Sequence, residues 1–254
     1  MENGDKIYCH VCKSEQLVDY KFCVSCGAKN LSFFKDKVTA DNDYSDNLRM
    51  LSIYSAIIVV ALIINLIFGT TVEFFVGLTI AFAIIDLIFA FAQPIVWNSV
   101  FRPVNPKPLF WIVPSFVASG IIISILVDNI NFLLFDEQAL SGYTFLFIDT
   151  TYPLLYSIIF VGVFPAIFEE LAFRGFLFNN LKKIAGINSA IWGSAFLFAL
   201  MHFSLIGIIW IFPFGLILAQ IRKHHSTILY GVAAHFIHNT TVVAIEYFFG
   251  SLVL

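Results

Sequence analysis

Six polar residues of types that serve in hydrolytic sites lie inside hydrophobic stretches of this 254-residue chain: Glu169, Glu170, Arg174, His202, His235 and Asn239. Such side chains are costly to place in hydrocarbon, so each one needs a structural or chemical reason. A carboxylate beside an imidazole can act as the general base on a water molecule. A histidine and an asparagine four residues apart can bind a metal or donate hydrogen bonds to an oxyanion. These residue types favour hydrolysis of a peptide bond within or near a membrane.

The spacing of the charged residues separates two kinds of role. Glu170 and Arg174 are four residues apart, which predicts an ion pair along one face of a helix. A purely structural ion pair would explain these two residues. Glu169 points about 100° away on a helix and is left without that partner. A lone histidine such as His202 is more often a core residue than a ligand, so position along the helices has to decide between the readings.

Depth along the predicted helices connects residues that are far apart in the sequence. With a rise of about 1.5 Å per residue, Glu169 lies roughly 16 Å and His202 roughly 20 Å from the cytoplasmic ends of their helices. The same rise puts His235 at roughly 12 Å and Asn239 at roughly 18 Å. Three different helices thus place polar groups near one level, and we predict that they form one site.

The composition identifies the elements that carry this site as membrane helices. Hydrophobic residues make up 59% of the chain and charged residues 12%, about half the charged fraction of soluble domains. Apolar blocks of roughly twenty residues are long enough to cross a bilayer. We predict an all-α polytopic membrane protein of about seven transmembrane helices, with a small N-terminal zinc-ribbon domain. The predicted spans are 51–68, 74–92, 109–127, 152–180, 189–204, 207–221 and 227–249.

The distribution of basic residues predicts the orientation. All 14 lysine and arginine residues fall before the first span, within the alternate loops on one side, or near that side, whereas the opposite loops carry acidic residues only. Cytoplasmic loops are enriched in lysine and arginine. We therefore expect an integral plasma membrane protein with a cytoplasmic N-terminus and the C-terminus outside.

The first residues form a separate polar segment that contains all four cysteines: Cys9, Cys12, Cys23 and Cys26. Two CxxC pairs can hold one Zn²⁺ tetrahedrally, and Gly27 suits the tight turn after the second pair. Disulfides are disfavoured because cytoplasmic thiols stay reduced. We predict a structural zinc ribbon in residues 1–29, a flexible polar linker in 30–47 and a transmembrane domain in 48–254. The ribbon either docks a protein partner or needs the metal merely to fold, and no nucleic acid is expected to bind.

The motifs together resemble a known family. EExxxR at Glu169, Glu170 and Arg174, FxxxH at Phe198 and His202, and HxxxN at His235 and Asn239 follow one another on successive hydrophobic helices. This order is similar to the CPBP family of intramembrane metalloproteases. The family comprises the type II CAAX prenyl endopeptidases and the Abi proteins of bacteriocin processing and self-immunity. The resemblance covers residues 150–245, and the added ribbon favours a bacterial member.

The resemblance implies roles for these residues. Glu169 would activate the attacking water together with His202, while His235 and Asn239 would stabilise the oxyanion, and Glu170 with Arg174 would organise the site. HExxH is absent, so a catalytic metal stays open beside the structural zinc. Expected partners are membrane lipids and a peptide or protein substrate, lipidated or membrane-associated. The rival hypothesis is a non-catalytic immunity protein or sensor-kinase regulator, and a transporter is a distant third because no internal repeat is found.

Overall fold

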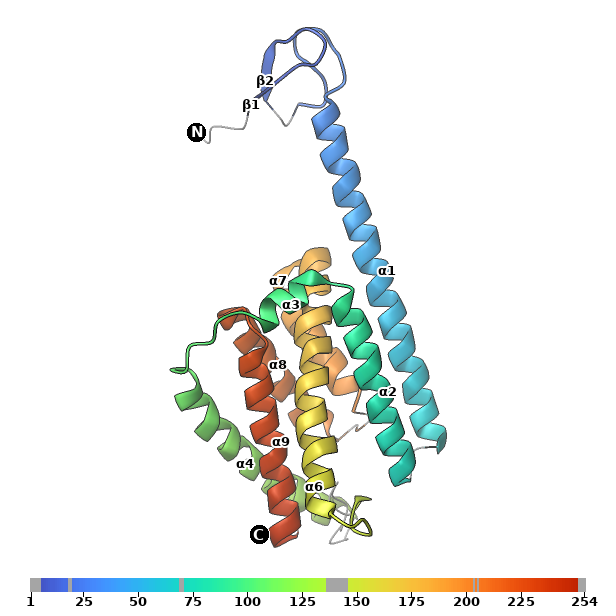
Figure 1. The fold of residues 1–254 in the computed structure, drawn as a ribbon, viewed down its shortest axis with the longest axis vertical. Coiled ribbons are helices and arrows are strands. Elements are labelled where there is room, and N and C mark those ends of the chain that lie inside the picture. Colours follow the sequence, from blue (N-terminus) through green and yellow to red (C-terminus); the bar gives the residue numbers. More distant parts are fainter. Residues whose placement is uncertain are drawn as a thin grey trace. The chain divides into compact units, whose positions relative to one another are not determined.

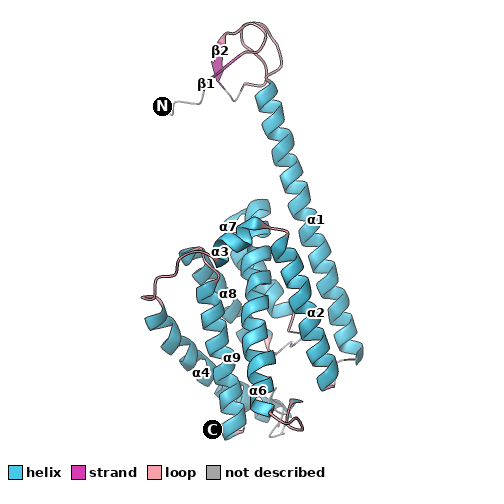
Figure 2. Ribbon diagram, viewed as in Figure 1, coloured by secondary structure: helices cyan, strands magenta, loops and turns pink. Residues whose placement is uncertain are grey.

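The computed structural model describes residues 6–17, 20–68, 71–135, 146–202, 204 and 206–250. Within the described part, strand occurs in the N-terminal segment and the rest is overwhelmingly helical (Figure 2). The chain divides into two compact units, Met1–Ser52 and Ile53–Leu254. Each unit is described by itself below.

The N-terminal unit begins with a small hairpin. Strands β1 (Lys6–Tyr8) and β2 (Glu15–Leu17) are antiparallel, with Ile7 opposite Gln16. A second turn follows and is closed by a bridge between Phe22 and Lys29. A hairpin this short has little stability of its own. Cys9 and Cys23 are buried beside it and serve as the core of this small unit.

Helix α1 (Leu31–Phe68) corrects one prediction. Residues 30–47 were expected to form a flexible linker, but the helix starts at Leu31 and runs through nearly all of them. The segment 31–68 contains no glycine and no proline, the two residues that most disfavour a helix interior. Polarity alone therefore gave a wrong prediction here, because polar residues without breakers also form helices.

Four helical segments of the described residues are long and apolar enough to cross a membrane: Tyr44–Phe68, Val72–Phe91, Leu109–Leu133 and Pro153–Leu200. They cover most of each of the first five predicted spans. Gly186, at φ 84° and ψ 178°, breaks the last segment into two helices, which correspond to the fourth and fifth spans. Helices also stand at the sixth and seventh predicted positions, as α8 (Ile208–His225) and α9 (Leu229–Phe249). The membrane class is confirmed, and the count of seven crossings stays a prediction.

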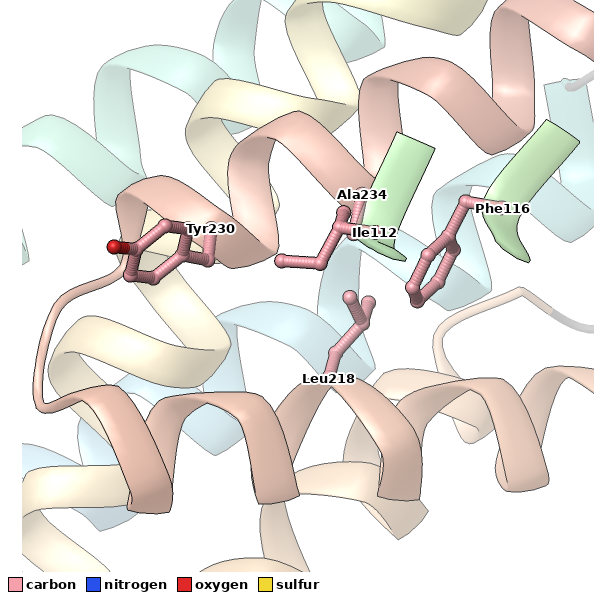
Figure 3. Close-up of a cluster of buried hydrophobic side chains, with 5 residues drawn as sticks. All are labelled: Ile112, Phe116, Leu218, Tyr230 and Ala234. Atoms are coloured by element: carbon pink, nitrogen blue, oxygen red, sulfur yellow. The ribbon is translucent and has the colours of Figure 1, made fainter. Parts of the chain in front are cut away.

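The second unit is a bundle of helices (Figure 1). Helix α2 (Val72–Phe91) is followed by the short α3 (Pro94–Val100) and the longer α4 (Leu109–Phe135). Helix α9 packs along α4 and α8, and α7 (Phe178–Leu200) packs along α8. Figure 3 shows the core where α4, α8 and α9 meet, formed by Ile112, Phe116, Leu218, Tyr230 and Ala234.

The fourth predicted span differs from an ordinary α-helix. It starts as α6 (Pro153–Ser157) and continues with π-helical geometry in η1 (Ile158–Val163) and η2 (Pro165–Leu177). Pro165 has no N–H to donate and so interrupts regular helix bonding. The wider π-helical turn is rare and is frequently found at functional sites. Both glutamates and the arginine of the EExxxR motif lie in η2.

Candidate functional site

The innermost feature of the candidate site is a buried ion pair on η2. Arg174 Nη1 donates to Glu170 Oε1 at 2.8 Å, and both side chains are fully buried. Arg174 Nη2 also donates to the carbonyl oxygen of Gly215 on α8, at 3.2 Å. The predicted i,i+4 pair is confirmed, and it connects two helices as well as two side chains.

His235 brings helix α9 to the same carboxylates. Its Nδ1 lies 3.2 Å from Glu170 Oε1, and its Nε2 lies 4.0 Å from Glu169 Oε2. Gly231, one turn earlier on α9, permits this approach, because a Cβ there would lie 2.6 Å from Glu170 Oε2. One imidazole thus faces two adjacent glutamates on the neighbouring helix.

The two glutamates differ in environment. Glu170 is held by Arg174 and His235 and is fully buried. The Glu169 side chain retains 17% of its exposure, and its buried Oε2 has no hydrogen-bond partner among the described residues. A buried polar atom without a partner is uncommon in folded proteins. Glu170 Oε2 also lacks a partner among the described residues, but the Glu170 side chain is fully buried, so Glu169 is the more accessible of the two carboxylates.

An aromatic ring that lies on α7 supports the charged groups. The Phe198 ring lies 4.3 Å from Arg174 Cζ, in the geometry of a cation–π contact. The same ring lies 4.9 Å from the imidazole of His202 and 5.7 Å from that of His235, between ring centres. Phe198 was predicted only as part of a motif, and the structure shows it in contact with three of the site's polar side chains.

His202 and Asn239 lie at the edge of this cluster. His202 Nδ1 is 2.8 Å from the carbonyl oxygen of Phe198, which leaves its Nε2 available. Asn239 Nδ2 donates to the carbonyl oxygen of Val161 on η1, also at 2.8 Å. In the described part of the chain neither residue bonds directly to a glutamate. The structure therefore joins Glu169, Glu170, Arg174 and His235 directly, His202 through Phe198, and Asn239 only through its position one turn beyond His235.

A second buried carboxyl group lies near Glu169. Asp86 of α2 accepts a hydrogen bond from Tyr54 Oη at 2.7 Å, and both side chains are buried. The bond joins helix α1, which carries Tyr54, to helix α2. Asp86 is also close enough to Glu169 for the two charges to interact electrostatically. The sequence gives one signal for it, which is an acidic residue inside a predicted span.

Comparison with known proteins now bears on this arrangement. Residues 151–241 match the model of the type II CAAX prenyl endopeptidase Rce1-like family. The matched segment contains all six predicted site residues and agrees with the resemblance expected for residues 150–245. At the level of the family, the match indicates a membrane endopeptidase. No curated protein and no solved structure matches the chain.

The family match begins well after the N-terminal unit, whose cysteines form a cluster of their own. The sulfur atoms of Cys9, Cys12, Cys23 and Cys26 all lie within 4.8 Å of one another. Cys9 and Cys26 are 3.7 Å apart, and Cys12 and Cys23 are 3.6 Å apart, between sulfur atoms. Sulfur atoms bound tetrahedrally at about 2.3 Å from one ion would be about 3.8 Å apart. The four thiols are thus placed to bind a single metal ion.

Two similar turns shape this cluster. The amide of Lys13 donates to Cys9 O, and the amide of Gly27 donates to Cys23 O. In both turns the bond therefore runs to the first cysteine of the CxxC pair from the residue four positions later. Gly27 has φ 72°, as its predicted role requires, and Lys13 adopts φ 59° at the equivalent place. A left-handed lysine costs about 1–2 kcal/mol, a cost that ligand geometry can impose.

The surroundings of the thiols favour the metal-binding form at one position. The Ser14 hydroxyl lies 3.3 Å from Cys23 Sγ and lowers the pKa of that thiol to about 5. At Cys26 the Ala28 amide favours the thiolate, but burial and the neighbouring thiols oppose it more strongly. Together they raise the pKa of the Cys26 thiol to about 12. Four adjacent thiolates repel one another, so a bound cation is what allows all of them to ionise.

Proposed function

We propose that this protein is an intramembrane endopeptidase that hydrolyses a peptide bond of a membrane-associated or lipidated peptide or protein. The observation that carries the proposal is the pairing of Glu169 with His235. Glu169 Oε2 has no hydrogen-bond partner among the described residues and lies 4.0 Å from His235 Nε2. A carboxylate and an imidazole at this separation can hold one water between them. The family match to residues 151–241 supports the same reaction class.

In the proposed mechanism, Glu169 accepts a proton from the attacking water. The water oxygen bonds to the carbonyl carbon of the substrate, and the carbonyl oxygen takes up the negative charge. The C–N bond then breaks, and the amine leaves with the proton that Glu169 received. Because Glu169 is the partly accessible glutamate, water and substrate can reach it more readily than they can reach Glu170.

Glu170 and Arg174 have an organising role in this proposal. Glu170 Oε1 accepts hydrogen bonds from Arg174 Nη1 and, when Nδ1 carries its proton, from His235. That arrangement fixes the ring so that Nε2 faces Glu169. With a proton on Nε2 as well, His235 would donate to the oxyanion and stabilise it together with Asn239. His202, with Nε2 available, would assist the water. Asn239 keeps one amide hydrogen for this purpose beyond the one it donates to Val161.

Among the described residues, the four cysteines form a group of potential ligands that lie close enough together to hold one metal ion. The proposed mechanism assigns the activation of water to Glu169 because its carboxylate lies beside His235 Nε2. We further propose zinc as the ion of the ribbon, because tetrahedral four-thiolate sites are typical of zinc. The cytoplasmic N-terminus and the external C-terminus belong to the same proposal and rest on the distribution of basic residues. The bacterial origin belongs to it as well and rests on the N-terminal ribbon.

The test is cleavage by the full chain in liposomes. The probes are fluorescence-quenched peptides, some carrying a farnesyl group near the C-terminus and some carrying a single membrane anchor, assayed in ¹⁸O-labelled water. We expect wild type to place ¹⁸O in the new carboxyl group and Glu169→Gln to lower the rate by about 1000-fold. Glu73→Gln is the matched control, because Glu73 lies exposed in the first turn of α2.

The same samples distinguish catalysis from the rival role as a non-catalytic partner. If the protein is a protease, Glu169→Ala and His202→Ala should both insert normally in cells, and both should lose the function that wild type provides. If both behave like wild type and only Cys9→Ser loses the phenotype, the protein acts through its ribbon and the proposed peptidase is wrong.

A further inference from the structure

A basic cavity lies between α3, α7 and α8, apart from the glutamate cluster. Its volume is about 460 Å³, and four cationic side chains line it: Arg102, Lys182, Arg222 and Lys223. Amide and hydroxyl groups, among them Asn98 and Ser99, complete the polar lining. None of the described residues that line the cavity is acidic. The cavity thus combines strong positive charge with hydrogen-bond donors suited to an anion.

The described neighbours of Arg222 include no anionic partner that would balance its charge. Its side chain is 8% exposed, and its Nε donates to the carbonyl oxygen of Arg174 at 3.0 Å. The neighbouring positive charge comes from Arg102, which repels it. A buried cation without an anionic partner is unfavourable. An anion in the cavity would offset both the burial of Arg222 and its repulsion by Arg102.

Topology alone does not explain this gathering of cations. Lysine and arginine on the cytoplasmic side of membrane helices orient a protein wherever they lie in the loops. Here the four cations come from distant parts of the sequence: just after α3, near the start of α7 and in the last turn of α8. The end of α8 is favourable for cations because of the helix dipole, but that effect reaches only Arg222 and Lys223.

The position of the cavity favours a lipid over a soluble ligand. Figure 1 shows α3, the start of α7 and the connection from α8 to α9 at one end of the bundle. Beside the cavity, the Trp97 ring stacks on Phe101 and contacts Phe91, and both phenylalanines are strongly exposed. Such aromatic clusters settle at the headgroup level of a bilayer. The cavity is therefore expected to open where phospholipid phosphates lie.

We propose that this cavity binds a phosphate group, and specifically that of an anionic phospholipid headgroup. Lys182 and Lys223, which have exposed side chains, supply mobile ammonium groups, while Arg102 and Arg222 supply the fixed charge. Basic pockets between membrane helices bind anionic headgroups by this chemistry. Free inorganic phosphate shares the chemistry and is the other source of such a ligand. This inference is independent of the proposed peptidase, because none of the four residues belongs to its mechanism.

The test measures lipid binding by native mass spectrometry on the full chain in an uncharged detergent. The probes are phosphatidylglycerol, phosphatidylcholine of the same acyl chains, and inorganic phosphate. The variant Lys182→Gln/Lys223→Gln removes two exposed charges from the cavity. Arg49→Gln/Lys107→Gln removes two exposed charges elsewhere and is the matched control for net charge.

We expect wild type to bind one phosphatidylglycerol in preference to phosphatidylcholine. The cavity variant should bind phosphatidylglycerol about tenfold more weakly, and the control should bind it like wild type. Equal binding of the two lipids by wild type, with phosphate binding that the cavity variant loses, would assign the site to free phosphate and overturn the lipid. Unchanged binding of every probe by the cavity variant would overturn the site itself.

Discussion

His235 Nδ1 lies 3.2 Å from Glu170 Oε1, and this contact joins helix α9 to η2 in the centre of the candidate site. The other ring nitrogen is thereby directed toward Glu169. In the proposed mechanism one imidazole thus serves both glutamates, since Glu170 would hold the ring and Glu169 would bind the water. The predictions below separate these tasks from one another and from the overall stability of the bundle.

The first prediction concerns the two nitrogens of His235. In His235→Asn, the amide nitrogen replaces Nδ1 and keeps the bond to Glu170, but nothing replaces Nε2 opposite Glu169. We expect thermal unfolding close to that of wild type and a rate of probe cleavage lowered by about 100-fold. His235→Ala should lose the same activity and also about 1–3 kcal/mol of stability, because a buried bond to a charged group is removed. Equal stability of the two variants would contradict the holding role of the Glu170 contact.

The second prediction concerns the buried guanidinium of Arg174. Arg174→Lys keeps the charge but cannot donate to both Glu170 and Gly215 and still lie flat on the Phe198 ring. We expect it to lower the free energy of unfolding by about 2–3 kcal/mol. Arg174→Met should cost about 3–5 kcal/mol, because it leaves Glu170 charged and buried.

A double-mutant cycle checks the cause of this loss. Combining Arg174→Met with Glu170→Gln removes both charges, so the double variant should be less destabilised than the sum of the two single variants. Unfolding in mixed micelles measures all four proteins, with Arg49→Met as the control for an exposed arginine. Additive effects would show that the pair does not act as a unit.

The sequence alone predicted the elements and half of this site well. Apolar blocks located the helices, and four-residue spacing predicted the pairing of Glu170 with Arg174, because both features are local. The pairing of His235 with the glutamates was reached only through depth along the helices. That argument works because a bilayer restricts every helix to a similar tilt and length.

Features that depend on packing between helices were missed. Two contacts join segments that are far apart in the chain: the Phe198 ring stacks on Arg174, and Arg222 donates to Arg174 O. No local sequence pattern predicts such contacts. The break at Gly186, by contrast, lies between the predicted spans 152–180 and 189–204 and agrees with them. The prediction of a flexible linker in residues 30–47 was wrong because the polarity of the segment was interpreted as irregular structure.

The third prediction separates the ribbon from the membrane site. Metal analysis of the purified chain should find one zinc per molecule, and Cys9→Ser should abolish it because the four sulfur atoms form one cluster. His10→Ala should retain the zinc, since His10 is exposed and lies outside the cluster. Cleavage of the probe by Cys9→Ser should stay within about twofold of wild type, because the cysteines and the glutamates belong to separate compact units and independent sites do not couple. Loss of cleavage in step with loss of zinc would assign the metal a part in catalysis.

The fourth prediction uses two helical glycines with opposite surroundings. A Cβ at Gly231 would lie 2.6 Å from Glu170 Oε2, whereas a Cβ at Gly77 on α2 would meet nothing within 4 Å. Gly77→Ala should therefore raise stability by about 0.5–1 kcal/mol, the ordinary gain from replacing a helical glycine. Gly231→Ala should instead lower stability by about 1–3 kcal/mol, as overpacking does. It should also reduce cleavage, because Glu170 must move and carries His235 with it. Thermal unfolding and the cleavage assay on both variants give the comparison, and a stabilised, active Gly231→Ala would show that the close approach of α9 to Glu170 is not required.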